Sequence, residues 1–210
     1  MSATSVRLVR FTTLACFGAL LGLGLGNGLA PAAALQAPEP SWLDDPNPPG
    51  WNLAGMPLPT APAPPFPIEA RFRERNRPPE TAEDAALVSA GWDLVAPYHA
   101  GWGVKLIMAA SYYDGMGRPL GFQWFVFVDG TFAGTLSPGL MNARSDSALT
   151  QAQFFGPTTL TADFVRYAAS DPLCCPSARS SVQFRIERSP QGPVVVPESA
   201  FTRPLAPERD

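Results

Sequence analysis

The run 121–136 constrains the fold more than any other part of the sequence. It consists of two strongly apolar stretches joined by Asp129-Gly130. Asp-Gly is typical of a two-residue turn in which both residues take positive φ, and such a turn joins adjacent antiparallel strands. The first stretch carries large side chains on both faces, so we expect a central strand covered on both sides. The turn predicts these facing pairs: Phe132 with Phe127, and Ala133 with Val126.

Apolar residues recur at every second position on both sides of this hairpin. The alternation is clearest from Trp102 to Ala110 and in 181–187, and it is the pattern of half-buried strands. Further strand-like runs lie at 151–155 and 158–167, and 194–196 predicts a short edge strand. Short turns between successive runs favour a meander. We therefore predict an α+β, mainly β fold: a single antiparallel sheet of roughly five to seven strands with one short N-terminal helix packed on it.

That helix is predicted to begin after Thr81. Thr81 can cap the free amides of the first turn, and Asp84 stands at the second position of a capping box. Gly91 is suited to the position that follows the last turn. The apolar residues between them form one short face, which we expect to cover the sheet.

More than half of the 25 prolines lie between Gln36 and Pro79. Proline removes a backbone donor and blocks helix, so this part should be extended. Its tryptophans, Trp42 and Trp51, either dock on the domain or belong to an unattached spacer. The predicted organisation is a signal peptide or uncleaved anchor at 1–34, a partly disordered proline-rich linker at 35–79, a β-rich domain at 80–197 and a disordered tail at 198–210.

The N-terminus has the layout of a secretory signal. Two arginines precede an apolar run from Phe11 to Leu29, and 32–34 offers the small residues of a cleavage site. Glycines within the run weaken it as a spanning helix, which favours a cleaved signal over an anchor. Cys16 could in principle be lipidated, but Thr13 stands where a lipobox usually has leucine. We interpret Cys16 as a small apolar residue of the signal.

Several motifs of the domain resemble the LppP/LprE lipoproteins of the bacterial cell envelope. They are the hairpin 127–135, the loop 144–146, Arg166-Tyr167, the double-cysteine loop 171–177 and the run 182–184. The resemblance covers roughly Trp92 to Ile186, and its most specific element is the cysteine loop. It implies an exported, envelope-associated domain that is periplasmic, secreted or membrane-anchored. It implies no known activity.

Cys174 and Cys175 are the only cysteines left once a signal is removed. Export places them in an oxidising compartment, where disulfides persist. Adjacent Cα atoms lie ~3.8 Å apart, below the usual ~4.4–6.8 Å span of a disulfide, so a bond between them closes a tight ring. We favour a structural disulfide that rigidifies the loop. The alternative is a thiol-disulfide participant or redox switch.

Other polar residues point to binding rather than catalysis. Arg144, Asp146, Arg166 and Asp171 lie in the family-like motifs and form a possible ligand-binding patch, although local turn capping would also explain them. His99 would need Ser145 and Asp146 nearby to act in a hydrolase, and no Gly-X-Ser-X-Gly elbow presents a nucleophile. A hydrolase is therefore a distant third hypothesis, and we assign no catalytic residue.

Composition excludes further classes. A net charge of −3 leaves no basic footprint for nucleic acid, and one histidine with three cysteines does not suit a zinc site. We expect no cofactor and no metal. The prediction is a monomeric, non-catalytic domain, associated with the membrane at most through its N-terminus, that binds an envelope protein or another envelope component.

Overall fold

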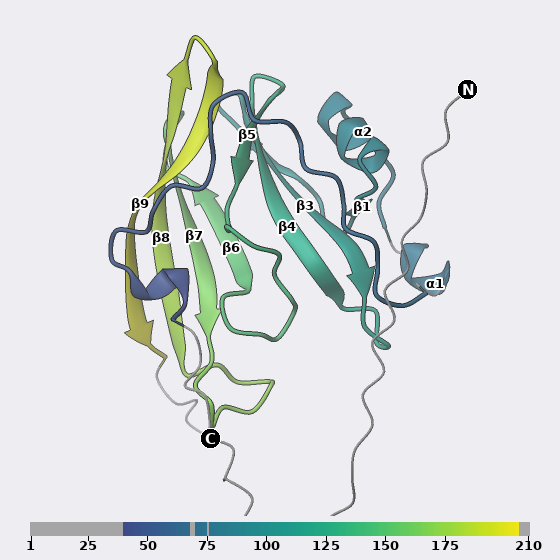
Figure 1. Ribbon diagram of the computed structural model, residues 1–210, viewed down its shortest axis with the longest axis vertical. Coiled ribbons are helices and arrows are strands. Elements are labelled where there is room, and N and C mark those ends of the chain that lie inside the picture. Colours follow the sequence, from purple (N-terminus) through teal and green to yellow (C-terminus); the bar gives the residue numbers. More distant parts are fainter. Residues whose placement is uncertain (1–39, 68–69, 75, 206–210) are drawn as a thin grey trace, which may run out of the picture. The chain divides into compact units, whose positions relative to one another are not determined.

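The hairpin 119–135 lies at the centre of the first of two antiparallel sheets in the computed structural model, which describes residues 40–67, 70–74 and 76–205 (Figure 1). Asp129 and Gly130 take φ of 48° and 80°, as the turn predicts. Phe127 faces Phe132 as expected. The second predicted pair is wrong, because a bulge after Val126 places Gly134 opposite that residue.

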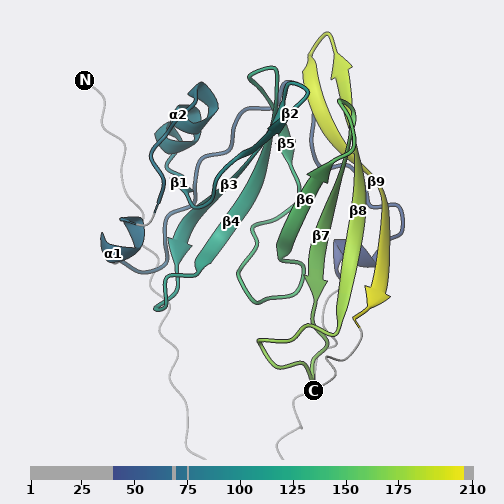
Figure 2. The ribbon, with the colours of Figure 1, turned by 180° about the vertical axis from the view of Figure 1, so that it is seen from behind.

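Nine strands, two short α-helices and one 3-10 helix make up the described residues (Figures 1 and 2). The helices are η1 (Trp42–Asp44), α1 (Ala70–Arg73) and α2 (Ala82–Ser89). The strands are β1 (Asp93–Leu94), β2 (His99–Gly101), β3 (Val104–Tyr113), β4 (Pro119–Val128), β5 (Thr131–Thr135), β6 (Leu149–Phe154), β7 (Thr159–Arg166), β8 (Ala178–Ser189) and β9 (Gly192–Pro204).

The prediction of a single sheet is wrong. Sheet A has the order β1-β3-β4-β5, with β2 also paired to β3, and sheet B has the order β6-β7-β8-β9. The chain leaves sheet A after Thr135, and the loop that follows carries it to β6, which pairs with β7 instead of β5. Every pairing is antiparallel, and neighbours in each sheet are consecutive, so each sheet is a meander of its own.

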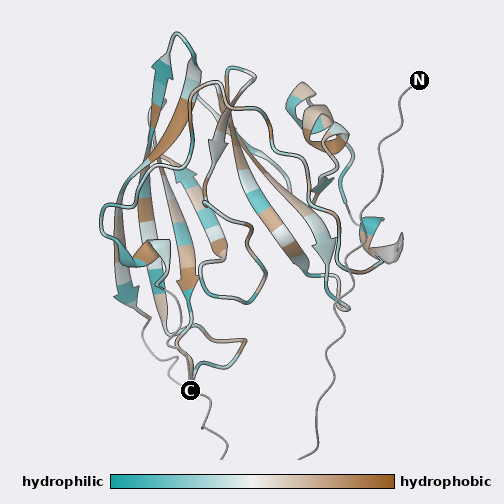
Figure 3. Ribbon diagram, in the orientation of Figure 1, coloured by the Kyte–Doolittle hydropathy of each residue, from teal (hydrophilic) through white to brown (hydrophobic). Residues whose placement is uncertain are grey.

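Two apolar clusters explain this layering. One contains the inner face of sheet A, such as Leu106 and Val126, together with Phe164 and Phe184 of sheet B. The other contains Phe125 of the outer face of sheet A with Leu87 of α2. Strand β4 is thus covered on both sides, as its uninterrupted apolar sequence predicts. Figure 3 shows the alternation of apolar and polar residues along the strands of sheet B.

Helix α2 begins and ends as predicted, but it is not N-terminal in the domain. Thr81 and Asp84 form the capping box, and Gly91 follows the helix with φ of 90°. The compact unit to which all described residues belong begins at Glu39, well before this helix. The buried carboxylate of Asp84 accepts two hydrogen bonds from the Arg77 guanidinium, at 2.7 and 2.6 Å. These bonds fix α2 to the chain that precedes it.

The proline-rich segment 40–67 docks on the domain. It runs from η1 along both sheets, as the dark-blue trace in Figure 1 shows, and Leu43 is only 2% exposed. Trp42 packs edge-on against Phe164, with ring centroids 5.1 Å apart. Of the two alternatives for the tryptophans of this segment, docking is therefore the one that the structure shows. The segment contributes to the core as an extended strap without strand pairing.

Asn52 holds this strap between the edges of the two sheets. Its amide nitrogen donates to the carbonyl oxygens of Thr135 in β5 and Val195 in β9, both at 2.9 Å. Its amide oxygen accepts from the Thr135 backbone nitrogen at 2.9 Å. A Cβ atom at Gly134 would overlap the Asn52 amide, so the approach requires glycine there. One buried side chain thus bridges two strand edges that do not pair with each other.

The predicted tail is also wrong at its start. β9 continues to Pro204 and pairs with the whole length of β8, so residues 198–204 are strand. The expected edge strand 194–196 is the middle of a much longer one. The predicted signal, including Cys16, and the last residues of the tail lie outside the described residues.

Candidate functional site

Arg166 occupies a position in β7 where the strand pattern calls for an apolar residue. Leu160, Ala162 and Phe164 point into the core at alternate positions, and Arg166 is next on that face. Its side chain is 16% exposed. A largely buried guanidinium requires charged or polar partners, because the loss of hydration is otherwise costly.

Three segments of the chain supply those partners. Arg166 Nη2 donates to Asp44 of η1 at 2.7 Å, and Nε donates to Asp146 of the β5–β6 loop at 3.0 Å. Nη1 donates to Ser180 Oγ in β8 at 3.3 Å. The hydrogen bond from Arg166 also holds the pKa of Asp44 below its usual range. Asp146 is fixed further by the backbone nitrogen of Tyr167, 2.8 Å away.

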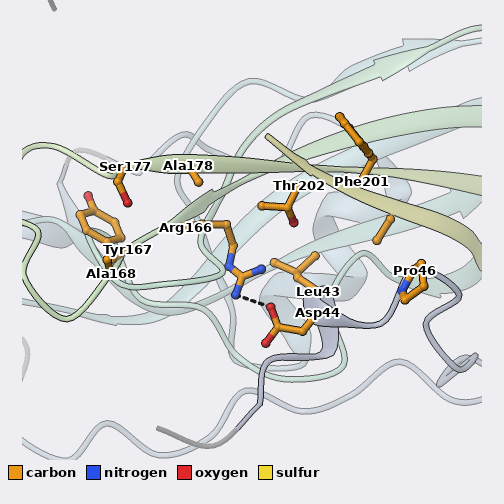
Figure 4. A pocket seen from close by; sticks show the side chains of 11 residues that line it. Leu43, Asp44, Pro46, Arg166, Tyr167, Ala168, Ser177, Ala178, Phe201 and Thr202 are labelled. Carbon is orange, nitrogen blue, oxygen red and sulfur yellow. Dashed lines mark hydrogen bonds and ion pairs between the residues drawn. The ribbon is translucent and has the colours of Figure 1, made fainter. Parts of the chain in front are cut away.

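Arg166, Asp44 and Tyr167 border a depression of about 500 Å³ where the ends of β7 and β9 meet η1 (Figure 4). Arg166 and Asp44 lie at its centre, joined by their ion pair, whereas the ring of Phe201 in β9, which is 69% exposed, points away from them. The residues that line it are Leu43, Asp44, Pro46, Arg166, Tyr167, Ala168, Ser177, Ala178, Ala200, Phe201 and Thr202. The depression therefore combines a fixed ion pair with hydroxyl groups.

The cysteine loop begins at the rim of this depression. Cys174 and Cys175 form a disulfide, and both are exposed. The bond joins adjacent residues and so does not link β7 to β8. The loop is closed instead by Asp171, whose carboxylate accepts from the backbone nitrogens of Ala168 at 2.7 Å and Ser177 at 2.9 Å. Hydrogen bonds from Ser177 and Ala168 hold the pKa of Asp171 below its usual range.

The structure brings only part of the predicted binding patch together. Arg166 and Asp146 are in contact, and Asp171 lies in the loop that starts beside them. Arg144 does not line the depression: it is exposed, takes φ of 60°, and within the described ranges has no hydrogen-bond or ion-pair partner. Asp146 and Asp171 both cap backbone nitrogens, as the alternative of local turn capping proposed.

Sequence reasoning missed Asp44 and Phe201. Asp44 lies in what the prolines indicated to be a linker, although Ser41 and Asp44 have the spacing of a capping box and form one. That spacing could have indicated a folded turn. Phe201 lies in the predicted tail, where no periodic pattern pointed to a strand.

His99 is not part of a catalytic triad here. Its ring lies 5.7 Å from that of Trp124, and neither ring nitrogen is hydrogen-bonded to another described residue. Ser145 donates to the Asn142 carbonyl at 2.6 Å, and Asp146 is engaged by Arg166. In the part of the chain that the structure covers, no group of three or more His, Cys, Asp or Glu side chains is arranged to hold a metal ion.

The fold and this site define a class of protein. It is a domain of two antiparallel β-sheets that carries a depression beside a disulfide between adjacent cysteines. Residues 104–189 match the family model described as LppP/LprE lipoprotein, a stretch that includes Arg166 and the cysteine loop. This match supports the resemblance to the LppP/LprE lipoproteins over the stretch that it covers.

Neither the curated proteins nor the solved structures yielded a match. None of the helices within 40–67, 70–74 and 76–205 has the length and apolar character that a bilayer crossing requires.

Proposed function

We propose that this protein is an envelope domain that binds a protein or another envelope component through the depression beside the cysteine loop, and that it catalyses no reaction. The observation that carries the proposal is the depression of about 500 Å³, whose central charged side chains are held in place by their ion pair. A concave site with a few fixed polar groups is typical of ligand binding.

The electrostatics of the depression favour binding over catalysis. A general acid or base needs a pKa near the working pH. The pKa of Asp44 is held below its usual range by Arg166, so this carboxylate is ionised at neutral pH. Asp146 is likewise committed to Arg166 and to the Tyr167 backbone. These bonds fix the positions of both carboxylates beside Arg166.

Affinity purification from envelope extracts tests the proposal. The bait is wild-type protein or Thr202→Glu, and Thr150→Glu is the matched control, because Thr150 is also exposed and does not line the depression. We expect the wild type and the control to retain the same component, and Thr202→Glu to lose it. If all three proteins retained the component equally, the depression would not be part of the binding surface.

A redox role of Cys174 and Cys175 is the second candidate, and their exposure favours it. In the exchange, a partner protein's dithiol supplies two electrons and two protons, the Cys174–Cys175 bond breaks to two thiols, and the partner leaves as a disulfide. Single variants, Cys174→Ser and Cys175→Ser, leave one thiol that can attack the disulfide form of such a partner: a mixed disulfide forms, the partner's own disulfide breaks, and its second sulfur leaves as a thiol. A trapped partner from envelope extracts that is released by reductant would favour this role over a purely structural one.

We also propose that the segment 1–34 directs export and is removed. The apolar run followed by small residues supports cleavage, while retention as an anchor or lipidation at Cys16 are the alternatives. Mass spectrometry of the protein from an envelope fraction separates them. An N-terminus at Leu35 supports cleavage, whereas an intact or acylated N-terminus contradicts it.

A further inference from the structure

A second cavity, of about 350 Å³, lies between the proline-rich segment and sheet A. It shares no lining residue with the depression described above. The segment is anchored on either side of it, by Asn52 at the strand edges and by the Ala61 backbone nitrogen, which donates to the Ala90 carbonyl at 2.8 Å. Its apolar walls are Trp51, Met56, Pro59, Pro62, Trp92 and Leu140.

Both indole rings present only carbon to the cavity. The N–H of Trp51 donates to the Thr135 carbonyl at 3.1 Å, and that of Trp92 donates to the Pro59 carbonyl at 2.8 Å. Each ring therefore has its one polar group already bonded to backbone. A ligand would meet the apolar part of both rings.

The polar side chains of the lining are engaged as well. Gln123 donates to the carbonyls of Ser137 and Gly139, each at 3.0 Å, and accepts from the Trp124 backbone nitrogen. The Thr135 hydroxyl donates to the Ser137 carbonyl, and Asn52 makes the three bonds already described. Among the lining residues only the exposed Thr60 hydroxyl has no partner, and none carries a charge.

We infer that this cavity binds the hydrocarbon chain of an envelope lipid. Its volume lies in the range of about 300–1,000 Å³ that is typical of small-ligand sites. A sugar or a charged headgroup would lose its hydration without gaining hydrogen bonds there, which is unfavourable. Two turns of an α-helix, about 10 Å across, need more space than the cavity provides. Leu140 lines the cavity and is 47% exposed to solvent. An apolar side chain in this position suits a hydrocarbon chain that enters the cavity from outside.

Contact quenching by a brominated fatty acid tests this inference. Bromine quenches an indole only at contact, and residues 1–39 contain no tryptophan, so full-length protein reports on the folded unit alone. We expect 11-bromoundecanoate, below its micelle concentration, to quench part of the tryptophan fluorescence saturably. The dissociation constant obtained from quenching should be unchanged in Trp102→Phe, because Trp102 lies outside the cavity.

Leu140→Asp is the decisive variant and Leu173→Asp its control. Leu173 is 67% exposed and lies in the cysteine loop, outside the lining. A carboxylate at position 140 should weaken binding about tenfold or more, because entry then requires its desolvation. Both residues are exposed, so both variants should keep the wild-type urea midpoint.

Three outcomes would overturn the inference. They are absence of saturable quenching in the wild type, equal affinity of Leu140→Asp and wild type, and a dimer in sedimentation velocity that Leu140→Asp dissociates. The last outcome would identify a second copy of the chain as the occupant. None of them affects the depression at Phe201, which shares no residue with the cavity.

Discussion

Two polar side chains, Asn52 and Arg166, connect parts of the chain that are distant in sequence. Asn52 is 7% exposed and joins the edges of β5 and β9, while Arg166 joins η1, the β5–β6 loop and β8. Both satisfy backbone or charged groups that would otherwise be buried without partners. Their contributions to stability should therefore exceed those of chemically similar exposed residues.

We expect Asn52→Ala to lower the free energy of unfolding by about 2–4 kcal/mol, because it leaves the Thr135 amide unbonded and opens a cavity. Urea denaturation followed by tryptophan fluorescence measures the change. Asn47→Ala is the control: Asn47 is exposed and lies in the same segment, and its replacement should change stability by less than about 0.5 kcal/mol. Similar losses for the two variants would show that Asn52 does not bridge the sheets.

At the scale of elements, α2 depends on a charged contact as much as on its apolar face. Asp84 is fully buried and forms an ion pair with Arg77. Its carboxylate also accepts hydrogen bonds from the backbone nitrogens of Glu80 and Thr81, which lie at the start of its own helix. Burial opposes its ionisation, but the hydrogen bonds from Arg77 and Glu80 outweigh that effect and lower the pKa of Asp84. The stabilisation is therefore present above the unfolded pKa, near 4, and is lost as the pH falls through the lower folded value.

Asp84→Asn should cost about 3 kcal/mol at pH 7, because it leaves the Arg77 guanidinium, 13% exposed, without its counter-charge. The gap between variant and wild type should narrow below about pH 4, as wild-type Asp84 becomes protonated. Urea midpoints across this pH range provide the measurement. Glu80→Gln is the matched control, since the Glu80 carboxylate is exposed, and its pH profile should follow that of the wild type.

The cysteine loop is closed by Asp171 more than by its disulfide. A bond between adjacent residues encloses almost no chain, so it removes little entropy from the unfolded state. We expect Cys174→Ser with Cys175→Ser to change stability by less than about 1 kcal/mol. Asp171→Ala, which frees both ends of the loop, should lower the melting temperature further. Calorimetry measures both melting temperatures. If the double cysteine variant lost more than Asp171→Ala, the disulfide would be the main restraint on the loop.

At the scale of the whole molecule, the proline-rich segment is part of the core. Its residues Trp42, Leu43 and Trp51 belong to or pack against the core cluster that contains Phe164 and Phe184 of sheet B. Asn52 bridges the two sheets. We therefore expect a chain of residues 80–210 to fold poorly. Compared with a chain of residues 40–210, it should lose its near-ultraviolet circular dichroism and its cooperative urea transition. A cooperative transition with the same midpoint in the shorter chain would contradict this role.

Much of the local structure could be predicted because its signals are local. The Asp129-Gly130 turn, the capping box at Thr81 and the alternation in β3 and β8 depend on residues a few positions apart. The proline-rich segment was harder, because prolines exclude helix and sheet whether an extended chain is docked or free. The site was predicted only in part for the same reason: Asp146 and Arg166 lie in family-like motifs, but Asp44 reaches Arg166 across 122 positions.

The sequence by itself therefore determined the strands, the turns and the helix caps, because short-range sterics and hydrogen bonds specify them. Only the tertiary structure decided that the strands form two sheets, because a loop after β5 can lead back to the same sheet or on to a new one. It also decided that Asn52 bridges their edges and that Asp44 pairs with Arg166. These contacts depend on the burial of surfaces from distant segments, which no local pattern encodes.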